Sequence, residues 1–308
     1  MPKRRRRRSS FFFNHSSSSD EEKDTSDTEC KQSEGSKKPR KRFTAQEQES
    51  EIEDKKERVA FEHTLNNNSE VYNEFEEDFI LTKLDLLENE SAYNWERINN
   101  DEDALTPKWR MFDGKSNIGY AKCQGTIETS PEDLLAWYWH FDSNQNRKKH
   151  VEQNGDDENA FPSRCESLIN NHHHLLYACR RMPFPLVARD FFSRGIWKKL
   201  DPNKFVLVYN YNDEKNSGLE IKKTTLNKSK VVRAEYQGCY LFERVARNKT
   251  FMSYVAKVDV RGMIPSALAN TGLKGVVGTV DRAVEYFEDQ SFLRREQDDS
   301  TDTPRSHK

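Results

Sequence analysis

Histidine and cysteine side chains lie close together in the middle of the chain and raise the question of metal binding or nucleophilic catalysis. The run His172-His173-His174 is flanked by Cys165 and Cys179. Consecutive side chains of a strand point to opposite faces, so the three histidines are not expected to supply the roughly four convergent ligands that zinc needs. Catalysis would need a nucleophile held beside a base, and nothing in the spacing of Cys179 and His174 fixes that geometry. The sequence therefore predicts no metal site, no cofactor and no enzyme.

Composition divides the chain into charged tails and a smaller folded part. Of the 308 residues, 33% are charged and 34% are hydrophobic, and the apolar residues are concentrated after about Val71. Residues 1–68 are expected to be a disordered charged tail, because they hold too few apolar side chains to offset the entropy of ordering. The remainder suffices for a single core, followed by a disordered C-terminal tail over 291–308.

Charge and cysteine content indicate the cellular compartment of the chain and its possible partners. The formal net charge is −2, which gives no strong nucleic-acid signal, although residues 3–8 and 37–42 form two basic blocks. These blocks suit a solvated tail, a nuclear-import signal, or an anionic partner such as an acidic membrane surface. The five cysteines include no CxxC pair, and no apolar run is long enough for a signal peptide or a membrane span. We therefore expect a cytoplasmic protein, with the nucleus as an alternative and peripheral membrane contact as an option.

A helix is expected before the main folded part. Residues 69–98 are predicted to form an amphipathic, coiled-coil-like helix that leads into the domain, with Ser69 as its N-cap. Val71, Phe75 and Phe79 recur at helical spacing on one face. Packing of this face on the domain is the expected role, and partner binding is the alternative.

After this helix the hydrophobic period changes to that of strands. Ser130 as N-cap and Pro131 as first helical residue predict a helix over 130–141. The other runs alternate and are separated by short turns, which predicts antiparallel pairing. Strands are expected at 117–128, 173–181, 190–199, 204–212, 230–245 and 250–260, and a last helix is expected at 265–289.

The positions of charged residues give the phase of the later strands. Charged side chains share one parity, and aromatic, apolar and hydroxyl-bearing side chains share the other. Tyrosine hydroxyls that point inward need partners, which water or a ligand head group can supply, so the pattern fits either a filled core or a pocket. The predicted inner face consists of Phe191, Ser193, Gly195, Trp197, Ala234, Tyr236, Gly238, Tyr240, Phe242, Met252, Tyr254, Ala256, Val258 and Val260.

Four segments together resemble the START (StAR-related lipid-transfer) domain family. They are MPFPLVARDFF (182–192), GTIETSPEDLLAWYW (125–139), Val232-Arg233 and VDVRGMIPSALAN (258–270). The resemblance covers about residues 91–290. It implies an α+β helix-grip fold, in which a curved antiparallel sheet wraps around a long C-terminal helix and leaves a lipid-sized tunnel between them.

The resemblance also implies roles for individual residues. Arg189-Asp190 is interpreted as a structural charge pair at the entry of a strand, with Pro183, Pro185 and Arg233 as further structural residues. Phosphatidylcholine-type members have an Asp where this chain has Val151, and sterol-type members have an Arg where it has Gly195, so neither head-group contact is expected. The lipid pocket is expected to be lined by Arg147, Phe191, Ser193, Trp197, Tyr236, Tyr240, Phe242, Met252, Tyr254, Val258, Leu273, Val277 and Val284.

Two functional hypotheses follow from the predicted fold and the resemblance. The first is a module that binds a hydrophobic ligand, a lipid, in an internal tunnel, either for transfer between membranes or for lipid sensing. The alternative is a START-fold interaction or regulatory module that binds no ligand and acts through its charged N-terminal tail.

Overall fold

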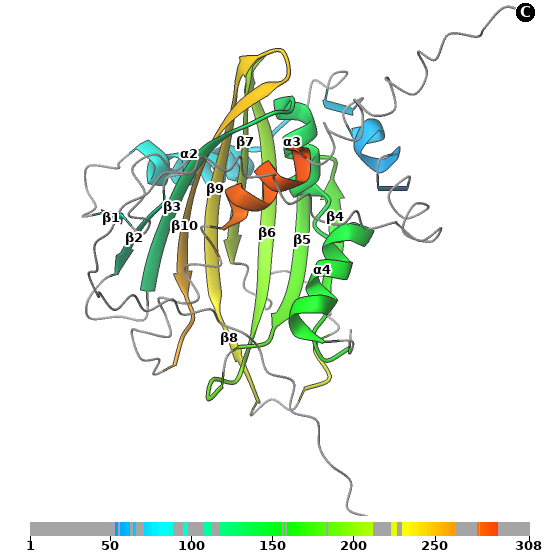
Figure 1. Cartoon of the computed structure of the whole chain (residues 1–308), viewed down its shortest axis with the longest axis vertical. Helices are drawn as coiled ribbons and strands as arrows, with labels where there is room; N and C mark the ends of the chain where they lie inside the picture. Colours follow the sequence, from blue (N-terminus) through cyan, green and yellow to red (C-terminus); the bar gives the residue numbers. More distant parts are fainter. Residues whose placement is uncertain are drawn as a thin grey trace, which may run out of the picture. The chain divides into compact units, whose positions relative to one another are not determined.

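A curved, ten-stranded sheet is the central element of the fold (Figure 1). The computed structural model describes residues 71–88, 95–97, 108–112, 118–262 and 276–288, the last two ranges with gaps, and parts of 53–65. The strands are β1 (Glu96–Arg97), β2 (Lys108–Phe112), β3 (Ile118–Ile127), β4 (Ser163–Asn170), β5 (His173–Arg180), β6 (Ala188–Asp201), β7 (Lys204–Tyr211), β8 (Val231–Arg233), β9 (Glu235–Ala246) and β10 (Lys249–Asp259).

The pairing of the strands is almost entirely antiparallel. Their order across the sheet is β1-β2-β3-β10-β9-β7-β6-β5-β4, and the short strand β8 pairs in parallel with β6. The β6–β7 turn is closed by the backbone N–H of Asn203, which donates to Asp201 Oδ1 at 2.7 Å. Asp and Asn favour such turns because their side chains bond nearby backbone groups. The predicted α+β fold with a curved antiparallel sheet is confirmed.

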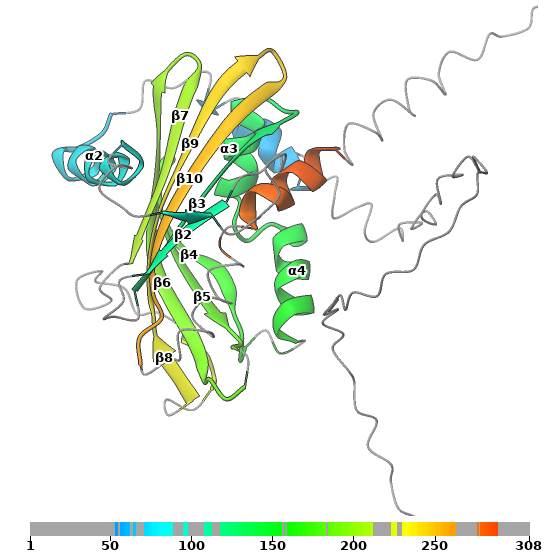
Figure 2. The same cartoon turned by 60° about the vertical axis from the view of Figure 1, so that its left-hand side comes forward.

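Helices cover both faces of the sheet (Figure 2). The helices α3 (Pro131–Trp139) and α4 (Asn144–Asn154) and the helical segment 279–288 lie on one side, which we call the inner face. The helix α2 (Glu74–Glu88) lies on the opposite side, the outer face. The sheet is thus the middle layer of the folded unit.

Two hydrophobic clusters confirm the predicted phase of the strands. Tyr240 and Tyr254 belong to the cluster under α3 and the segment 279–288, together with Trp197. Their sequence neighbours Cys239 and Val255 belong instead to the cluster under α2. Alternate residues of a strand point to opposite faces, so one face is buried by each layer of helices.

The helix on the outer face is shorter than expected. It runs from Glu74 to Glu88, and Glu96–Arg97 form a strand, so the predicted helix over 69–98 was wrong at its C-terminal end. Ser69 lies outside the described residues, and Asn73 is the cap that the structure shows. Asn73 Oδ1 accepts from the backbone N–H of Glu76 at 3.0 Å, and Glu76 accepts from the backbone N–H of Asn73 at 3.1 Å. This reciprocal pair is a capping box.

Part of the expected N-terminal tail is folded. Residues 56–61 are helical, and Phe61 and Leu65 are buried in the inner cluster. The ring of Phe61 lies 5.9 Å from that of Trp139 and 5.6 Å from that of Trp197. The prediction of disorder over 1–68 was therefore wrong for these residues, because two apolar side chains suffice to attach a short helix to a core. Residues 1–52 lie outside the described part.

The helix α4 and the strands β1, β2 and β4 were missed from the sequence. The helix α4 reads NQNRKKHVEQN and has almost no apolar periodicity, because its buried side chains are the polar His150 and Asn154. The strand β4 is an edge strand with two register shifts against β5, which interrupt its alternation. The expected helix 265–289 is described as helical at 276 and over 279–288. Residues 265–275 and 277 lie outside the described part, and the expected grip of the sheet on a long helix lies there too.

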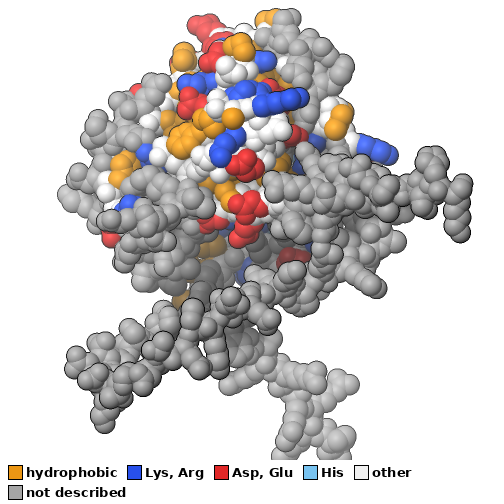
Figure 3. Space-filling view, turned by 45° about the horizontal axis from the view of Figure 1, so that its top comes forward, with side chains coloured by type: hydrophobic (Ala, Val, Ile, Leu, Met, Phe, Trp, Pro, Cys, Tyr) orange, Lys and Arg blue, Asp and Glu red, His pale blue; other side chains and the backbone are white. Residues whose placement is uncertain are grey.

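The described surface carries mixed side chains. Figure 3 shows basic, acidic and apolar side chains interspersed on one face, without a continuous field of one charge. Among the helices that the structure describes, none has the length and apolar character to cross a bilayer.

Candidate functional site on the inner face of the sheet

Three tyrosines that the sequence placed on the inner face meet at its centre. The hydroxyls of Tyr236 and Tyr254 lie 2.9 Å apart, and those of Tyr236 and Tyr240 lie 3.5 Å apart. The rings of Tyr240 and Tyr254 stack with centroids 4.2 Å apart. Burial raises the pKa of Tyr236 and of Tyr254 well above the ordinary value, so both hydroxyls stay protonated at neutral pH. These three predicted polar groups therefore bond one another inside the fold.

Aromatic side chains of α3 join this cluster to the C-terminal segment. The Tyr138 hydroxyl donates to the Thr279 carbonyl oxygen at 3.0 Å. Trp137 stacks on Tyr286 with centroids 5.6 Å apart, and Val284 packs against the same cluster. The segment 279–288 thus covers the inner face. Val284, which was predicted to face the pocket, contacts this face. The predicted pocket residues Leu273 and Val277 lie outside the residues whose side chains are described.

A buried histidine beside this cluster was not foreseen. His174 stacks on Trp139 with centroids 3.7 Å apart, and its Nε2 is buried without a hydrogen-bond partner in the described part of the chain. It pairs across strands with Gly195, where an added Cβ would lie 2.3 Å from His174 Nε2. Glycine at 195 is therefore explained by the space that the imidazole occupies. The contact between His174 and Gly195 depends on the register between β5 and β6, which cannot be derived from the sequence pattern.

The other predicted pocket residues differ in how deeply they are buried. Arg147 is exposed on α4, so the prediction that it lines the interior was wrong, and His150, one turn later, is the buried residue of that helix. Phe191 is half-buried, and Ser193 is buried on β6. The remaining four lie in the inner hydrophobic cluster: Trp197, Phe242, Met252 and Val258.

The entry of β6 is held by charges, although not by the expected pair. Arg189 and Asp190 are adjacent on the strand and point to opposite faces, so they do not bond each other. Arg189 donates to the carbonyl oxygens of Val187 and Val260, both at 2.6 Å. Asp190 instead accepts two bonds from Arg233, both of 2.9 Å. The pair that fixes strand entry is therefore Asp190–Arg233. Pro185 is exposed in the preceding turn, and Pro183 lies outside the described residues.

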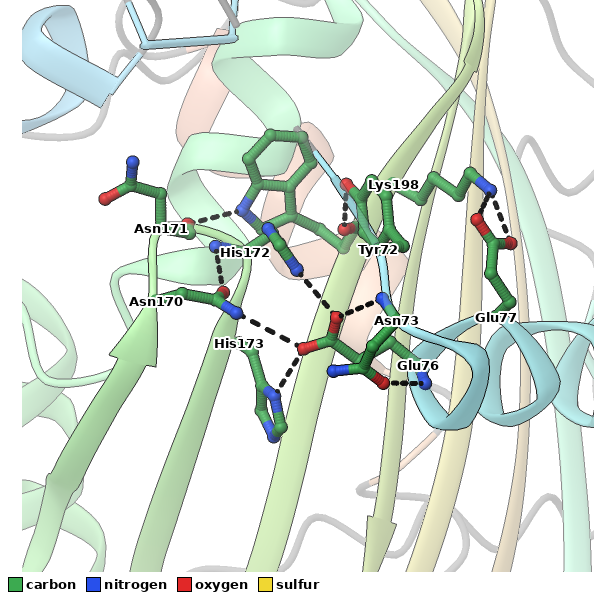
Figure 4. Close-up of polar contacts among 10 residues, drawn as sticks. Tyr72, Asn73, Glu76, Glu77, Asn170, Asn171, His172, His173 and Lys198 are labelled. Atoms are coloured by element: carbon green, nitrogen blue, oxygen red, sulfur yellow. Dashed lines mark hydrogen bonds and ion pairs between the residues drawn. The ribbon is translucent and has the colours of Figure 1, made fainter. Parts of the chain in front are cut away.

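The outer face has its own polar centre, a single buried carboxylate at the start of α2 (Figure 4). Glu76 accepts from His173 Nδ1 at 2.8 Å, from His172 Nε2 at 3.2 Å and from Asn170 Nδ2 at 3.2 Å. Burial alone would raise the pKa of Glu76, but these bonds and that from the Asn73 backbone outweigh it and lower the pKa to about 2. His172 lies in the turn before β5, which is why it reaches the same carboxylate as His173, whereas His174 points to the inner face.

The buried imidazole of His174 predicts a measurable loss of stability in acid. Burial lowers its pKa from 6.5 to about 3, so between these values the unfolded chain binds a proton that the folded chain does not. Stability is then fully present above pH 6.5 and falls as the pH decreases towards 3, by about 1.4 kcal/mol per pH unit for this one group. His174→Gln should reduce the slope of the unfolding free energy against pH by about 1.4 kcal/mol per pH unit between pH 6 and pH 4. Urea unfolding at several pH values measures it, and an unchanged slope would contradict the assignment.

A protein-family model and several solved structures are similar to this chain. The START domain family model matches residues 159–283. The structure of human STARD10 superposes with a TM-score of 0.50 at 18% identity, covering 71% of this chain and 80% of that one. The human StarD13 (DLC2) lipid transfer and protein localization domain gives 0.47 at 16% identity, covering 71% and 98%.

Human StAR-related lipid transfer protein 5 gives a TM-score of 0.46 at 10% identity, covering 70% of this chain and 96% of that one. No curated protein sequence matches the chain. Residues 159–283 thus match the START domain family model, and they lie within a curved antiparallel sheet that helices cover.

Proposed function

We propose that this chain binds a lipid in an internal tunnel between the inner face of the sheet and the helices that cover it. The observation that carries the proposal is the match of residues 159–283 to the START domain, together with a deeply buried aromatic and apolar inner face. Removal of apolar ligand surface from water would supply the affinity, at about 25 cal/mol per Å². A lipid chain gains several kcal/mol in this way before any polar contact forms.

The aromatic cluster restricts where such a ligand lies. The hydroxyls of Tyr236, Tyr240 and Tyr254 bond one another, and His174 and Trp139 fill the space beside Gly195. We therefore place the ligand on the part of the inner face next to α4 rather than within this layer. Transfer between membranes and lipid sensing both require such a site, and the ligand's release and delivery distinguish them.

Native mass spectrometry of the purified full-length chain tests the proposal. We expect a co-purifying lipid, or uptake of lipid after incubation with mixed phospholipid vesicles, at one ligand per chain. Absence of both overturns the proposal and leaves the interaction module that acts through its charged N-terminal tail.

A truncation decides the role of the tail in the same assay. The cut should remove residues 1–50 and not 1–68, because Phe61 and Leu65 belong to the core. If lipid uptake is the function of the domain, the truncated chain takes up lipid as the full chain does. Loss of partner binding or localisation on truncation, in a chain that never takes up lipid, supports the alternative.

A further inference from the structure

An arginine at the end of β5 faces the inner side of the sheet. His174 and Leu176 of this strand contact the inner cluster, and Arg180 continues the same alternation. Its guanidinium Nη1 contacts His150 Nδ1 of α4, the helix that covers this part of the inner face (Figure 2). Arg180 is thus partly buried between β5 and α4, beside the place proposed for the ligand.

Within the described part of the chain, no carboxylate neutralises Arg180. Its described side-chain partner is His150, whose Nε2 donates to the Phe161 carbonyl oxygen at 2.7 Å, which leaves Nδ1 as an acceptor. Burial, and then the charge of Arg180, lower the pKa of His150 to about 4, so this imidazole is neutral at pH 7. The pair therefore carries one net positive charge.

A second cation, Arg282, lies close enough to affect Arg180. Burial first, and then the positive charge of Arg282 on the segment 279–288, lower the pKa of Arg180 to about 10. Two other arginines of this part of the sheet have several acceptors each, because Arg189 donates to backbone carbonyl oxygens and Arg233 pairs with the carboxylate of Asp190. The described side-chain partner of Arg180 is, by contrast, a single neutral imidazole. An uncompensated charge withdrawn from water is costly, and a bound anion removes that cost.

We propose that Arg180 binds the anionic end, a carboxylate or a phosphate, of the lipid on the inner face. The inference rests on the proposed function and narrows its ligand class to lipids with an acidic end group. A guanidinium offers five N–H donors in a planar fork that matches both anions, and one of them is directed at His150. A neutral head group would leave the charge of Arg180 without compensation.

Matched probes test the inference on the full-length chain. The probes are NBD-labelled dodecanoic acid and its methyl ester, which share the same chain and differ in the negative charge. The variants are Arg180→Gln and the control Arg181→Gln, which removes the same charge from the exposed neighbouring side chain. We expect the wild-type chain and Arg181→Gln to bind the acid at least tenfold more tightly than the ester. Arg180→Gln should lose this preference while its affinity for the ester changes less than twofold, which also shows that the variant is folded.

The outcomes separate this inference from the proposed function. Equal affinity of the wild-type chain for acid and ester, or a preference that survives in Arg180→Gln, overturns the role of Arg180 and leaves lipid binding intact. Failure of the wild-type chain to bind either probe, or any lipid from vesicles, overturns the proposed function itself. Competition by dodecyl phosphate that is stronger than competition by dodecanoic acid identifies a phosphate as the preferred anion, and the reverse order identifies a carboxylate.

Discussion

Replacing Glu76 with alanine is expected to lower the free energy of unfolding by about 3–5 kcal/mol, the largest effect of any single substitution considered for this chain. Glu76 is 1% exposed and accepts hydrogen bonds from His172, His173, Asn170 and the backbone of Asn73. Its loss removes the acceptor of the buried imidazoles of His172 and His173 and removes the N-terminal capping box of α2. Urea unfolding followed by tryptophan fluorescence and circular dichroism measures the change.

The adjacent residue provides a matched control. Glu77 lies on the same helical turn and forms an ion pair with Lys198 at 2.5 Å, but its side chain is 41% exposed. Exposed ion pairs contribute about 0–1 kcal/mol, so Glu77→Ala should change stability by less than 1 kcal/mol. Hydrogen exchange should show faster exchange of α2 amides in Glu76→Ala and not in Glu77→Ala. Equal effects of the two substitutions would show that Glu76 is not the residue that fixes α2 to the sheet.

Sequence reasoning was reliable where a local pattern determines the structure. The alternation in β9 and β10 placed Tyr240 and Tyr254 on the inner face, and the clusters of the structure agree. Ser130 caps α3 as expected, because its Oγ accepts from the backbone N–H of Asp133 at 3.1 Å. Capping and face selection depend on residues a few positions apart, and these are visible in the sequence.

The contacts that the sequence did not reveal join residues far apart in the chain. In the sequence, Glu76 cannot be distinguished from the other acidic residues of an amphipathic helix. Its burial depends on how α2 lies against the β4–β5 turn. His150 and Arg180 meet because α4 crosses the end of β5. Asp190 pairs with Arg233 and not with its neighbour Arg189, which follows from the pairing of β6 with β8. Register and helix placement decide such contacts, and single-sequence periodicity contains neither.

Gly195→Ala is expected to destabilise the chain by about 3 kcal/mol, at the upper end of the range for added volume in a packed core. An added Cβ would lie 2.3 Å from His174 Nε2 and 2.6 Å from Tyr209 Cε1. His174 cannot move away freely because its ring stacks on Trp139 at 3.7 Å, and Tyr209 lies in the buried cluster. The added methyl group therefore forces a displacement of aromatic rings that hold α3 to the sheet, and urea unfolding measures its cost.

A double-mutant cycle with His174→Ala identifies the source of this strain. If the clash with the imidazole dominates, Gly195→Ala should cost about 1–2 kcal/mol less in the His174→Ala background than in the wild-type chain. The remaining cost comes from the contact with Tyr209, which both backgrounds retain. Strictly additive effects would show that His174 does not impose glycine at 195. The glycine would then have to be explained by Tyr209 alone, and the stacked position of His174 between Trp139 and β6 would be wrong.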